Sequence, residues 1–290
     1  MSDDKSEAFF LYSILQKEQL NTTVVRLQVV APLIAAKAQA GQFVILRVDG
    51  EGERIPLTIA DFNPVEGTVS LIFQIVGATT AALSRLEVGD RLADLVGPLG
   101  RPTETEGLSR VVVVGGGVGC AIAYPVAKKL REQGAEVYGI TGFRNKELVI
   151  LQDEFAAVSH TLVTVTDDGS FGEKGLVTDA LDRLIESGVH PDRVIAIGPL
   201  PMMKYVCKVT EKYNIPTVVS MNPIMIDGTG MCGGCRLTVG GKVKFACVDG
   251  PEFDGHQVDF DEAMRRSGMY YEAERHAYED HCNLFRKEVR

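Results

Sequence analysis

Short runs of alternating hydrophobic and polar residues occupy the first third of the chain, separated by turn-forming residues. Residues 23–29, Thr-Val-Val-Arg-Leu-Gln-Val, show an alternation that is typical of strands with one buried face. Several short strands so close together favour a small antiparallel β-barrel over residues 1–100. The pattern predicts strands at residues 9–15, 22–30, 42–48, 68–76 and 91–96 and one short helix at 79–86.

A different pattern begins after residues 100–109, whose Pro102 and alternating Thr and Glu are typical of a linker. Continuous apolar runs now alternate with helical stretches, as expected for a parallel sheet buried on both faces. The fold class is therefore a β-barrel followed by an α/β domain at residues 110–221, and residues 222–290 form a third segment with a mostly helical tail. The α/β pattern predicts five strands, at residues 111–114, 135–141, 160–166, 193–197 and 217–221.

A glycine-rich turn, Gly-Gly-Gly-Val-Gly at residues 115–119, follows the first strand of the α/β domain. A strand, a glycine turn and a helix in this order predict a phosphate-binding turn. The dinucleotide fingerprint is incomplete, because Cys120 occupies the place of its last glycine and no Asp or Glu closes the next strand.

The turns after the other parallel strands carry further candidates for nucleotide binding, because open parallel sheets bind ligands at that edge. Arg144 and Lys146 could hold a 2′-phosphate, which would favour NADP, or could simply be solvated. The remaining candidates are Asp168, Gly198 and Met202.

Two stretches of the predicted barrel have the chemistry of a phosphate site. Arg54-Ile55-Pro56-Leu57-Thr58 places a guanidinium and a hydroxyl around a proline that would fix a turn. Residues 76–80, Val-Gly-Ala-Thr-Thr, lead a strand into a helix start, where free amides favour an anion. The alternative is that Arg54 is a surface charge and Thr79 a helix cap.

Residues 227–247 contain the most specific chemical pattern of the chain. Cys232 and Cys235 lie two residues apart, Cys247 follows at a distance, and Asp227 stands five positions before Cys232. Plant-type [2Fe-2S] proteins use this spacing with cysteine in the first place, so Asp227, Cys232, Cys235 and Cys247 are the predicted cluster ligands. Glycines around them suit a loop that wraps a compact centre.

Two other interpretations of these cysteines remain open. Zinc also accepts cysteines two residues apart, with Asp227 or His256 as the fourth ligand, although structural zinc sites favour sets of Cys and His. A disulfide between Cys232 and Cys235 would require an oxidising compartment. The other cysteines, Cys120, Cys207 and Cys282, are interpreted as buried or bystander thiols.

Composition excludes several classes of function. The 290 residues carry a formal net charge of −9 without a basic cluster, which argues against nucleic acid as a partner. No apolar run approaches the roughly 18 residues that cross a bilayer, so no membrane association is expected. The first residues lack the features of a secretory signal, and we therefore expect a cytoplasmic protein with reduced cysteines.

The order of these motifs resembles the ferredoxin-NADP reductase superfamily. The resemblance rests on Arg-x-Pro-Leu-Thr at 54–58, the glycine turn at 115–119 and Gly-Pro-x-x-Met at 198–202, and it covers residues 9–221. The cysteine segment resembles the electron-transfer subunit of dihydroorotate dehydrogenase. With Asp at position 227, the segment is more similar to that of the small subunit of NADH-dependent reduced ferredoxin:NADP oxidoreductase, also called the sulfide dehydrogenase beta subunit.

The resemblance implies three cofactors, FAD, NAD(P)H and a [2Fe-2S] cluster, and assigns residues to them. Thr58 would lie near flavin N5 as the catalytic residue. Ile197 replaces a cysteine found in many superfamily members, so no thiol would stand beside the nicotinamide. The FAD residues would be Arg54, Pro56, Leu57, Thr58, Gln74, Val76, Gly77, Thr79 and Thr80. The nicotinamide nucleotide would meet Gly116, Gly117, Val118, Arg144, Asp168, Gly198 and Met202.

The implied function is electron transfer, with hydride passing between NAD(P)H and FAD and single electrons between FAD and the cluster. The partner would be a larger flavin and iron–sulfur subunit, through which ferredoxin takes part in electron bifurcation. Two alternatives remain: an electron-transfer subunit that serves dihydroorotate oxidation, and a zinc-stabilised nucleotide-binding interaction module without redox activity.

Overall fold

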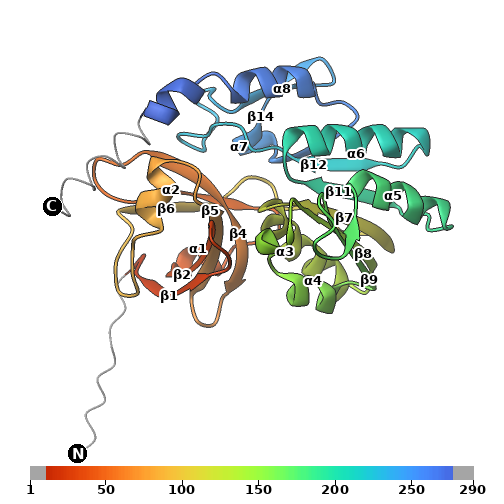
Figure 1. The fold of residues 1–290 in the computed structure, drawn as a ribbon. Helices are drawn as coiled ribbons and strands as arrows, with labels where there is room; N and C mark the ends of the chain where they lie inside the picture. Colours follow the sequence, from red (N-terminus) through yellow and green to blue (C-terminus); the bar gives the residue numbers. More distant parts are fainter. Residues whose placement is uncertain (1–10, 277–290) are drawn as a thin grey trace, which may run out of the picture.

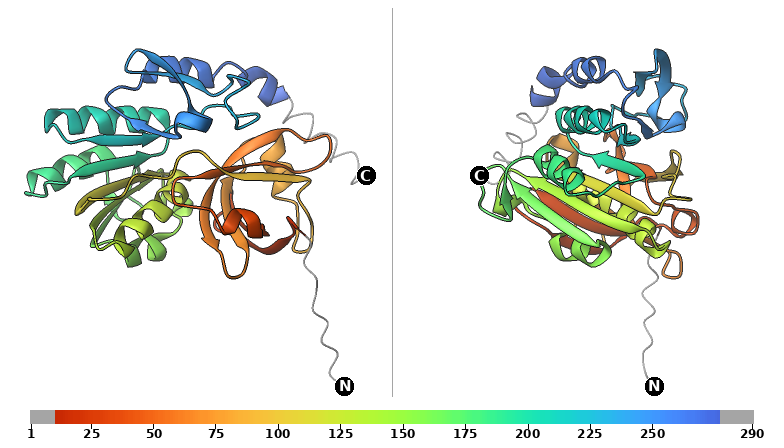
Figure 2. Two further views of the ribbon diagram at one scale, coloured as in Figure 1. Left: turned by 180° about the vertical axis from the view of Figure 1, so that it is seen from behind. Right: turned by 90° about the vertical axis from the view of Figure 1, so that its right-hand side faces the viewer.

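The computed structural model describes residues 11–276 of the chain. A unit made mostly of β-strands, drawn in red to yellow, lies beside an α/β unit drawn in yellow-green to teal (Figure 1). The blue carboxyl-terminal segment runs along one side of both units, as the view from behind also shows (Figure 2). None of the helices in the described residues has both the length and the apolar character that a membrane span requires.

The amino-terminal unit is a six-stranded antiparallel sheet in the order β1-β2-β5-β4-β3-β6. In β2 the side chains of Val25, Leu27 and Val29 are fully buried while Arg26 and Gln28 point outwards, so the alternation seen in the sequence sets the two faces. The elements are β1 (Ile14–Gln19), β2 (Val24–Val30), α1 (Pro32–Ala35), β3 (Phe43–Arg47), β4 (Arg54–Asn63), β5 (Thr68–Gln74), α2 (Ala78–Leu83) and β6 (Asp94–Leu99).

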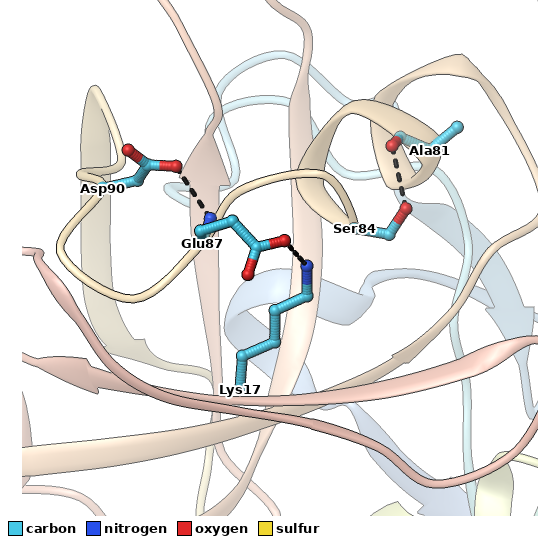
Figure 3. A network of polar contacts seen from close by, with 5 residues as sticks. All are labelled: Lys17, Ala81, Ser84, Glu87 and Asp90. Carbon is cyan, nitrogen blue, oxygen red and sulfur yellow. Dashed lines mark hydrogen bonds and ion pairs between the residues drawn. The ribbon is translucent and has the colours of Figure 1, made fainter.

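The stretches that lead into β1 and β6 join the two ends of this sheet. Ser13 forms a bridge with Arg91, and the Ile14 amide donates a 2.9 Å hydrogen bond to the Asp90 carbonyl. Beside this seam Lys17 on β1 forms an ion pair with Glu87, whose amide donates to the Asp90 carboxylate (Figure 3). The predicted barrel is therefore confirmed; its first strand begins at Ile14, and residues 9 and 10 of the predicted strand lie outside the described residues.

The turn predicted around Pro56 is wrong, because Pro56 lies inside strand β4. β4 pairs with β3 from Arg54 to Thr58, but with β5 only from Ile59 onwards. Pro56 therefore occupies the half of β4 that has one partner strand, where its missing N–H costs no ladder hydrogen bond on the open side.

The second unit is a sheet of seven strands in the order β10-β9-β8-β7-β11-β12-β15. All five predicted parallel strands are present, and two edge strands that the sequence pattern does not predict complete the sheet. β10 is a two-residue parallel strand, whereas β15 is antiparallel and comes from the carboxyl-terminal segment. The strands are β7 (Arg110–Gly116), β8 (Glu136–Phe143), β9 (Thr161–Thr166), β10 (Glu173–Lys174), β11 (Arg193–Ile197), β12 (Thr217–Ser220) and β15 (Glu252–Asp254).

Helices cover both faces of this sheet. Val111 and Val113 of β7 pack on the side of α3, whereas Val112 and Val114 pack on the side of α5 and α6. A strand buried on both faces explains the continuous apolar run in the sequence. The helices are α3 (Gly119–Glu132), η1 (Lys146–Leu148), α4 (Gln152–Val158), α5 (Val177–Glu186) and α6 (Leu200–Lys212).

The carboxyl-terminal segment packs against both units. β15 extends the sheet, and the positions next to Gly228 are filled by Ile45 and Leu99 of the barrel. The predicted helical tail begins with α8 and breaks at Gly268, and its residues from 277 onwards, including Cys282, lie outside the described part. The segment contains β13 (Arg236–Val239), β14 (Lys242–Phe245), α7 (Ala246–Asp249) and α8 (Phe260–Ser267).

Candidate functional site

A cavity of about 1200 Å³ lies between the barrel and the carboxyl edge of the parallel sheet. Its barrel wall comes from β4 and β5, and its other wall comes from the glycine turn and from α5 and α6. Twelve of the sixteen predicted cofactor residues line this one space. They are Pro56, Leu57, Thr58, Gln74, Val76, Thr80, Gly116, Gly117, Val118, Arg144, Gly198 and Met202.

The barrel wall is the half of β4 that β5 leaves uncovered. Thr58 pairs with Phe43 through the backbone, and both residues line the cavity. No hydrogen-bond partner is found for the Thr58 hydroxyl in residues 11–276, so this group is available to a bound ligand. A largely apolar wall with one free hydroxyl suits an aromatic ring that carries polar edge atoms.

Close packing of backbone explains the glycines at the opposite wall. A Cβ atom on Gly116 would lie 2.3 Å from Met202 Sδ, and one on Gly119 would lie 2.4 Å from the Ile197 carbonyl oxygen. Gly117 has φ +56° and donates its amide to the Gly142 carbonyl. The first turn of α3 therefore meets β11 without intervening side chains, where helix amides and the helix dipole favour an anion.

Four predicted cofactor residues do not line the cavity: Arg54, Gly77, Thr79 and Asp168. The Thr79 hydroxyl donates to the Glu53 carboxylate at 3.0 Å rather than to an anion. Arg54 is exposed and has no partner among the described residues. The Ser170 hydroxyl and amide donate to Asp168 and hold the pKa of its carboxyl below the usual value.

One cavity wall escaped prediction because it is a helix face rather than a turn. Tyr205, Lys208 and Lys212 of α6 continue the line that begins at Met202, and Lys208 Nζ lies 5.0 Å from the centroid of the Tyr205 ring. Spacings of three and four residues place these side chains on one face of the helix. That periodicity is visible in the sequence but does not tell a ligand-binding face from a core face.

The cysteine loop lies at the junction of the carboxyl-terminal segment with the barrel. Cys235 and Cys247 are buried with their sulfurs 3.3 Å apart, whereas Cys232 is exposed. Burial, followed by the contact with Cys235, raises the pKa of the Cys247 thiol to about 12. This thiol therefore stays protonated at neutral pH unless a metal binds it.

Asp227 organises the amide groups of this loop. Its carboxylate accepts hydrogen bonds from the amides of Thr229 at 2.8 Å and Cys232 at 2.9 Å, and the Thr229 amide in particular lowers its pKa. Within the described residues no three His, Cys, Asp or Glu side chains are already gathered as a metal site. Ligation by Asp227 thus stays a prediction.

The alternatives for the cysteines receive little support from the geometry. His256 Nε2 lies 3.0 Å from Thr210 Oγ1, so the ring contacts α6 rather than the cysteine loop. Cys232 and Cys235 are free thiols. Cys120 and Cys207 are buried, as predicted for bystanders, and burial raises the pKa of each to about 12.

Residues 222–259 match the model of the iron-sulfur cluster binding domain of dihydroorotate dehydrogenase B. A Thermotoga maritima protein described as a dihydroorotate dehydrogenase B electron transfer subunit homolog is 47% identical over 269 residues, covering 93% of this chain and 95% of that protein. The electron transfer subunit of dihydroorotate dehydrogenase B from Streptococcus mutans is 35% identical over 259 residues. The match covers 83% of this chain and 98% of that protein. The chain belongs to this family of electron-transfer subunits.

A solved structure also matches most of this electron-transfer subunit. It is a chain from work on flavin-based electron bifurcation by NADH-dependent reduced ferredoxin-NADP oxidoreductase, with 45% identity and a TM-score of 0.89. The match covers 93% of this chain and 98% of that one. The predicted ferredoxin-reductase-like fold with a carboxyl-terminal iron–sulfur domain is confirmed.

Proposed function

We propose that the protein takes electrons from NAD(P)H and passes them to a larger flavin and iron–sulfur subunit, in an NADH-dependent reduced ferredoxin:NADP oxidoreductase that bifurcates electrons. One observation carries the proposal. Residues predicted for two nucleotide cofactors, although they come from separate units of the chain, line a single cavity of about 1200 Å³. A space shared in this way is what transfer between two bound rings requires.

The cavity fits FAD on the barrel side and a nicotinamide nucleotide on the sheet side. Pro56, Leu57 and Thr58 would hold the flavin ring, and Gly116, Gly117 and Val118 would hold the nucleotide at the start of α3. Arg54, Gly77 and Thr79 remain proposals for the diphosphate, since their side chains or backbone would have to turn towards it. A bound flavin would supply the conversion between two-electron and one-electron transfer.

The cysteine loop fits a [2Fe-2S] cluster held by Asp227, Cys232, Cys235 and Cys247. Two of the sulfurs are already in contact, and the other two groups belong to one turn, because the Cys232 amide donates to Asp227. The buried Cys247 thiol, whose pKa is raised, and a short glycine-rich loop suit a centre that brings its own positive charge.

Dihydroorotate oxidation is the second candidate, because the relatives from Thermotoga and Streptococcus carry that description. The first candidate is supported by the 45% identity with the ferredoxin-NADP oxidoreductase chain and by Asp227 at the first ligand position. In both cases the protein works with a larger subunit, whose active site selects the substrate. The third candidate is a zinc-stabilised module without redox activity.

Absorption spectra and iron analysis of anaerobically purified protein test the cofactors. We expect flavin bands with a broad cluster absorption and about two iron atoms per chain. Cys247→Ser should lose iron and keep flavin. The matched control Cys120→Ala, which removes a thiol from the buried cluster where the start of α3 packs against the barrel, should keep both. A colourless, zinc-containing protein would refute the proposal.

Co-purification with the partner subunit separates the two redox candidates. The complex should oxidise NADPH and reduce NAD⁺ only when oxidised ferredoxin is present as the second electron acceptor, two NADPH reducing one NAD⁺ and two ferredoxins, and should not respond to dihydroorotate. Dihydroorotate-dependent reduction of NAD⁺ would replace the first candidate with the second.

A further inference from the structure

The proposed cofactor cavity has a third wall, which comes from the end of β12 and from the carboxyl-terminal segment. Five residues of this part of the chain line the space, namely Ser220, Met221, Asn222, Met225 and Pro251. Met225 precedes Asp227 by two positions, and Pro251 follows Cys247 by four. All four predicted cluster ligands therefore lie on one excursion of the chain, residues 222–250, that leaves and re-enters at the cavity.

Backbone pairing holds the two ends of this excursion together. The Met221 amide donates to the Pro251 carbonyl at 2.9 Å, and beside this bond β12 pairs with β15. Within the excursion the Ala246 amide donates to the Cys235 carbonyl at 3.1 Å, which brings Cys235 close to Cys247. The cluster loop is thus closed at its base, and the base forms part of the cavity wall.

The exit end of the excursion packs against the barrel. A Cβ atom on Gly100 would lie 2.8 Å from Phe43 Cε1 and 2.9 Å from Pro251 Cδ, so both side chains close over the backbone of Gly100. Phe43 pairs with Thr58 and itself lines the cavity. The barrel wall of the cavity therefore continues into the exit end.

Two polar contacts tie the exit end to the linker as well. The Arg101 amide donates to the Gly250 carbonyl at 2.7 Å, and Glu252 Oε1 accepts a 2.6 Å hydrogen bond from the Thr103 hydroxyl. Hydrogen bonds on two sides thus fix the chain where it leaves the cluster loop.

The entry end lacks such bonds. Within residues 11–276, no backbone hydrogen bond is found to residues 222–226. Met225 is the buried residue of this stretch, with 4% of its surface exposed, whereas Ile224 and Ile226 on either side are exposed. Met225 belongs to the buried cluster that also contains Cys235 and Cys247, and it lines the cavity. The placement of the chain before the first predicted ligand thus depends on one side chain, which the cavity wall and the cysteine core share.

We propose that Met225 is a positioning residue through which a flavin ring in the cavity and the iron–sulfur centre stabilise each other. The inference rests on the proposed function, since it takes flavin and cluster as the two occupants. A ring against Thr58 and Phe43 keeps the apolar side chain of Met225 away from water. Without the ring, water reaches that side chain and the entry end opens more often.

The coupling requires contacts that exist only when the loop is closed, and Met225 supplies one. Because such coupling is reciprocal, the cluster raises the affinity for flavin by the same factor by which flavin raises the affinity for the cluster. A chain without iron therefore still binds flavin when FAD is in excess, but binds it more weakly.

Iron release from the full chain measures this coupling without relying on activity. Protein that carries both groups is freed of flavin, and the anaerobic transfer of iron to a ferrous chelator is followed with and without added FAD. Added FAD should slow the release by about fivefold or more, the lower end of coupling between two sites. Hydrogen exchange of the iron-free chain is a second readout, because FAD should raise the protection of peptides covering residues 222–235.

Substitutions of methionine identify the residue that carries the effect. Met225→Ala should reduce the effect of FAD to less than about twofold, because a void replaces the contact. Met225→Leu, which has a similar volume, should restore it. The matched control Met203→Ala removes the same side chain from the same buried cluster, at a position that does not line the cavity, and should keep the wild-type effect.

The outcomes separate this inference from the proposed function. If the protein holds flavin and iron but FAD changes neither iron release nor exchange of the loop, the role of Met225 is overturned and the proposed function stands. An FAD effect that survives in Met225→Ala has the same meaning. Protein that binds neither flavin nor iron overturns both. If Met225→Ala does not fold, Met225→Val, which shortens the side chain but keeps it apolar, takes its place.

Discussion

The two glycine-rich loops of this molecule, at residues 115–119 and 228–234, need glycine for different reasons. In the turn at residues 115–119 the reason is space. Cβ atoms on Gly115, Gly116 and Gly119 would lie within 2.9 Å of neighbouring atoms, and only Gly117 in this turn has a positive φ. In this turn, strand β11, helix α3 and Met202 pack directly against glycine backbone, with no side chain between them.

In the loop at residues 228–234 the main reason is backbone conformation. Gly228, Gly230 and Gly233 have φ values of +75°, +83° and +68°, in the region that side chains disfavour. Around Gly233 and Gly234 a Cβ atom would meet nothing closer than 3.5 Å. In the proposed sites, the first loop would therefore form a rigid wall for a ligand, whereas the second would fold its amides around a centre.

Gly119→Ala should give the largest effect and tests the rigid wall. The new Cβ would lie 2.4 Å from the Ile197 carbonyl oxygen and 2.8 Å from Gly198 Cα, backbone atoms that cannot rotate away. We expect a loss of about 2–3 kcal/mol in the free energy of unfolding, as for an overpacked core, and weaker nucleotide binding. Chemical denaturation and titration with NADH measure both. If the variant were as stable as the wild type, α3 would be able to move away from β11, and the wall would not be rigid.

Gly233→Ala should be intermediate, with a loss of about 1–2 kcal/mol from the left-handed backbone alone. Because the nearest atom to the new Cβ lies 3.8 Å away, no steric contribution is expected. The variant should bind less iron while retaining NADH binding in the cavity. A simultaneous loss of both would contradict the separation of the two loops.

Asp227→Cys should change the cluster rather than the fold. An oxygen ligand is harder and more readily protonated than a thiolate, so the wild-type potential should depend more on pH than that of the variant. Redox titration at several pH values measures this. Identical potentials would reject Asp227 as a ligand and leave it the role of holding the Thr229 and Cys232 amides.

Gly234→Ala should have the smallest effect, within about 0.5 kcal/mol of the wild type. Gly234 has neither a positive φ nor a close neighbour, since the nearest atom to a Cβ there would be 3.5 Å away. Denaturation and iron content should both match the wild type. A large loss would mean that the loop tightens around its centre more than its backbone conformation requires.

The sequence predicted most strands because alternation and apolar runs record which faces are buried. β2 and β11 follow their predicted ranges within two residues. The sequence pattern did not predict β4, because Pro56 favours a turn. Proline is tolerated there because β5 pairs with only part of the strand. β15 escaped because three residues carry no periodic signal, and its partner β12 is distant in the chain.

The site was predictable where a residue type itself carries the chemistry. Cysteine spacing located the cluster loop, and the glycine turn located the wall of the cavity. Sequence could not show that Thr79 bonds Glu53 or that Asp227 accepts two amides, because such partners are set by local rotamers. The contact between Glu252 and Thr103 carried no signal either, since it depends on the space that Gly41 leaves in the barrel.

The placement of Pro56 has a consequence for the newly made chain. The first half of β4 has an open edge that another polypeptide could extend by strand addition. A residue that cannot donate from its nitrogen interrupts that edge. Pro56 would thereby protect the apoprotein from self-association at the edge that the proposed flavin site leaves open.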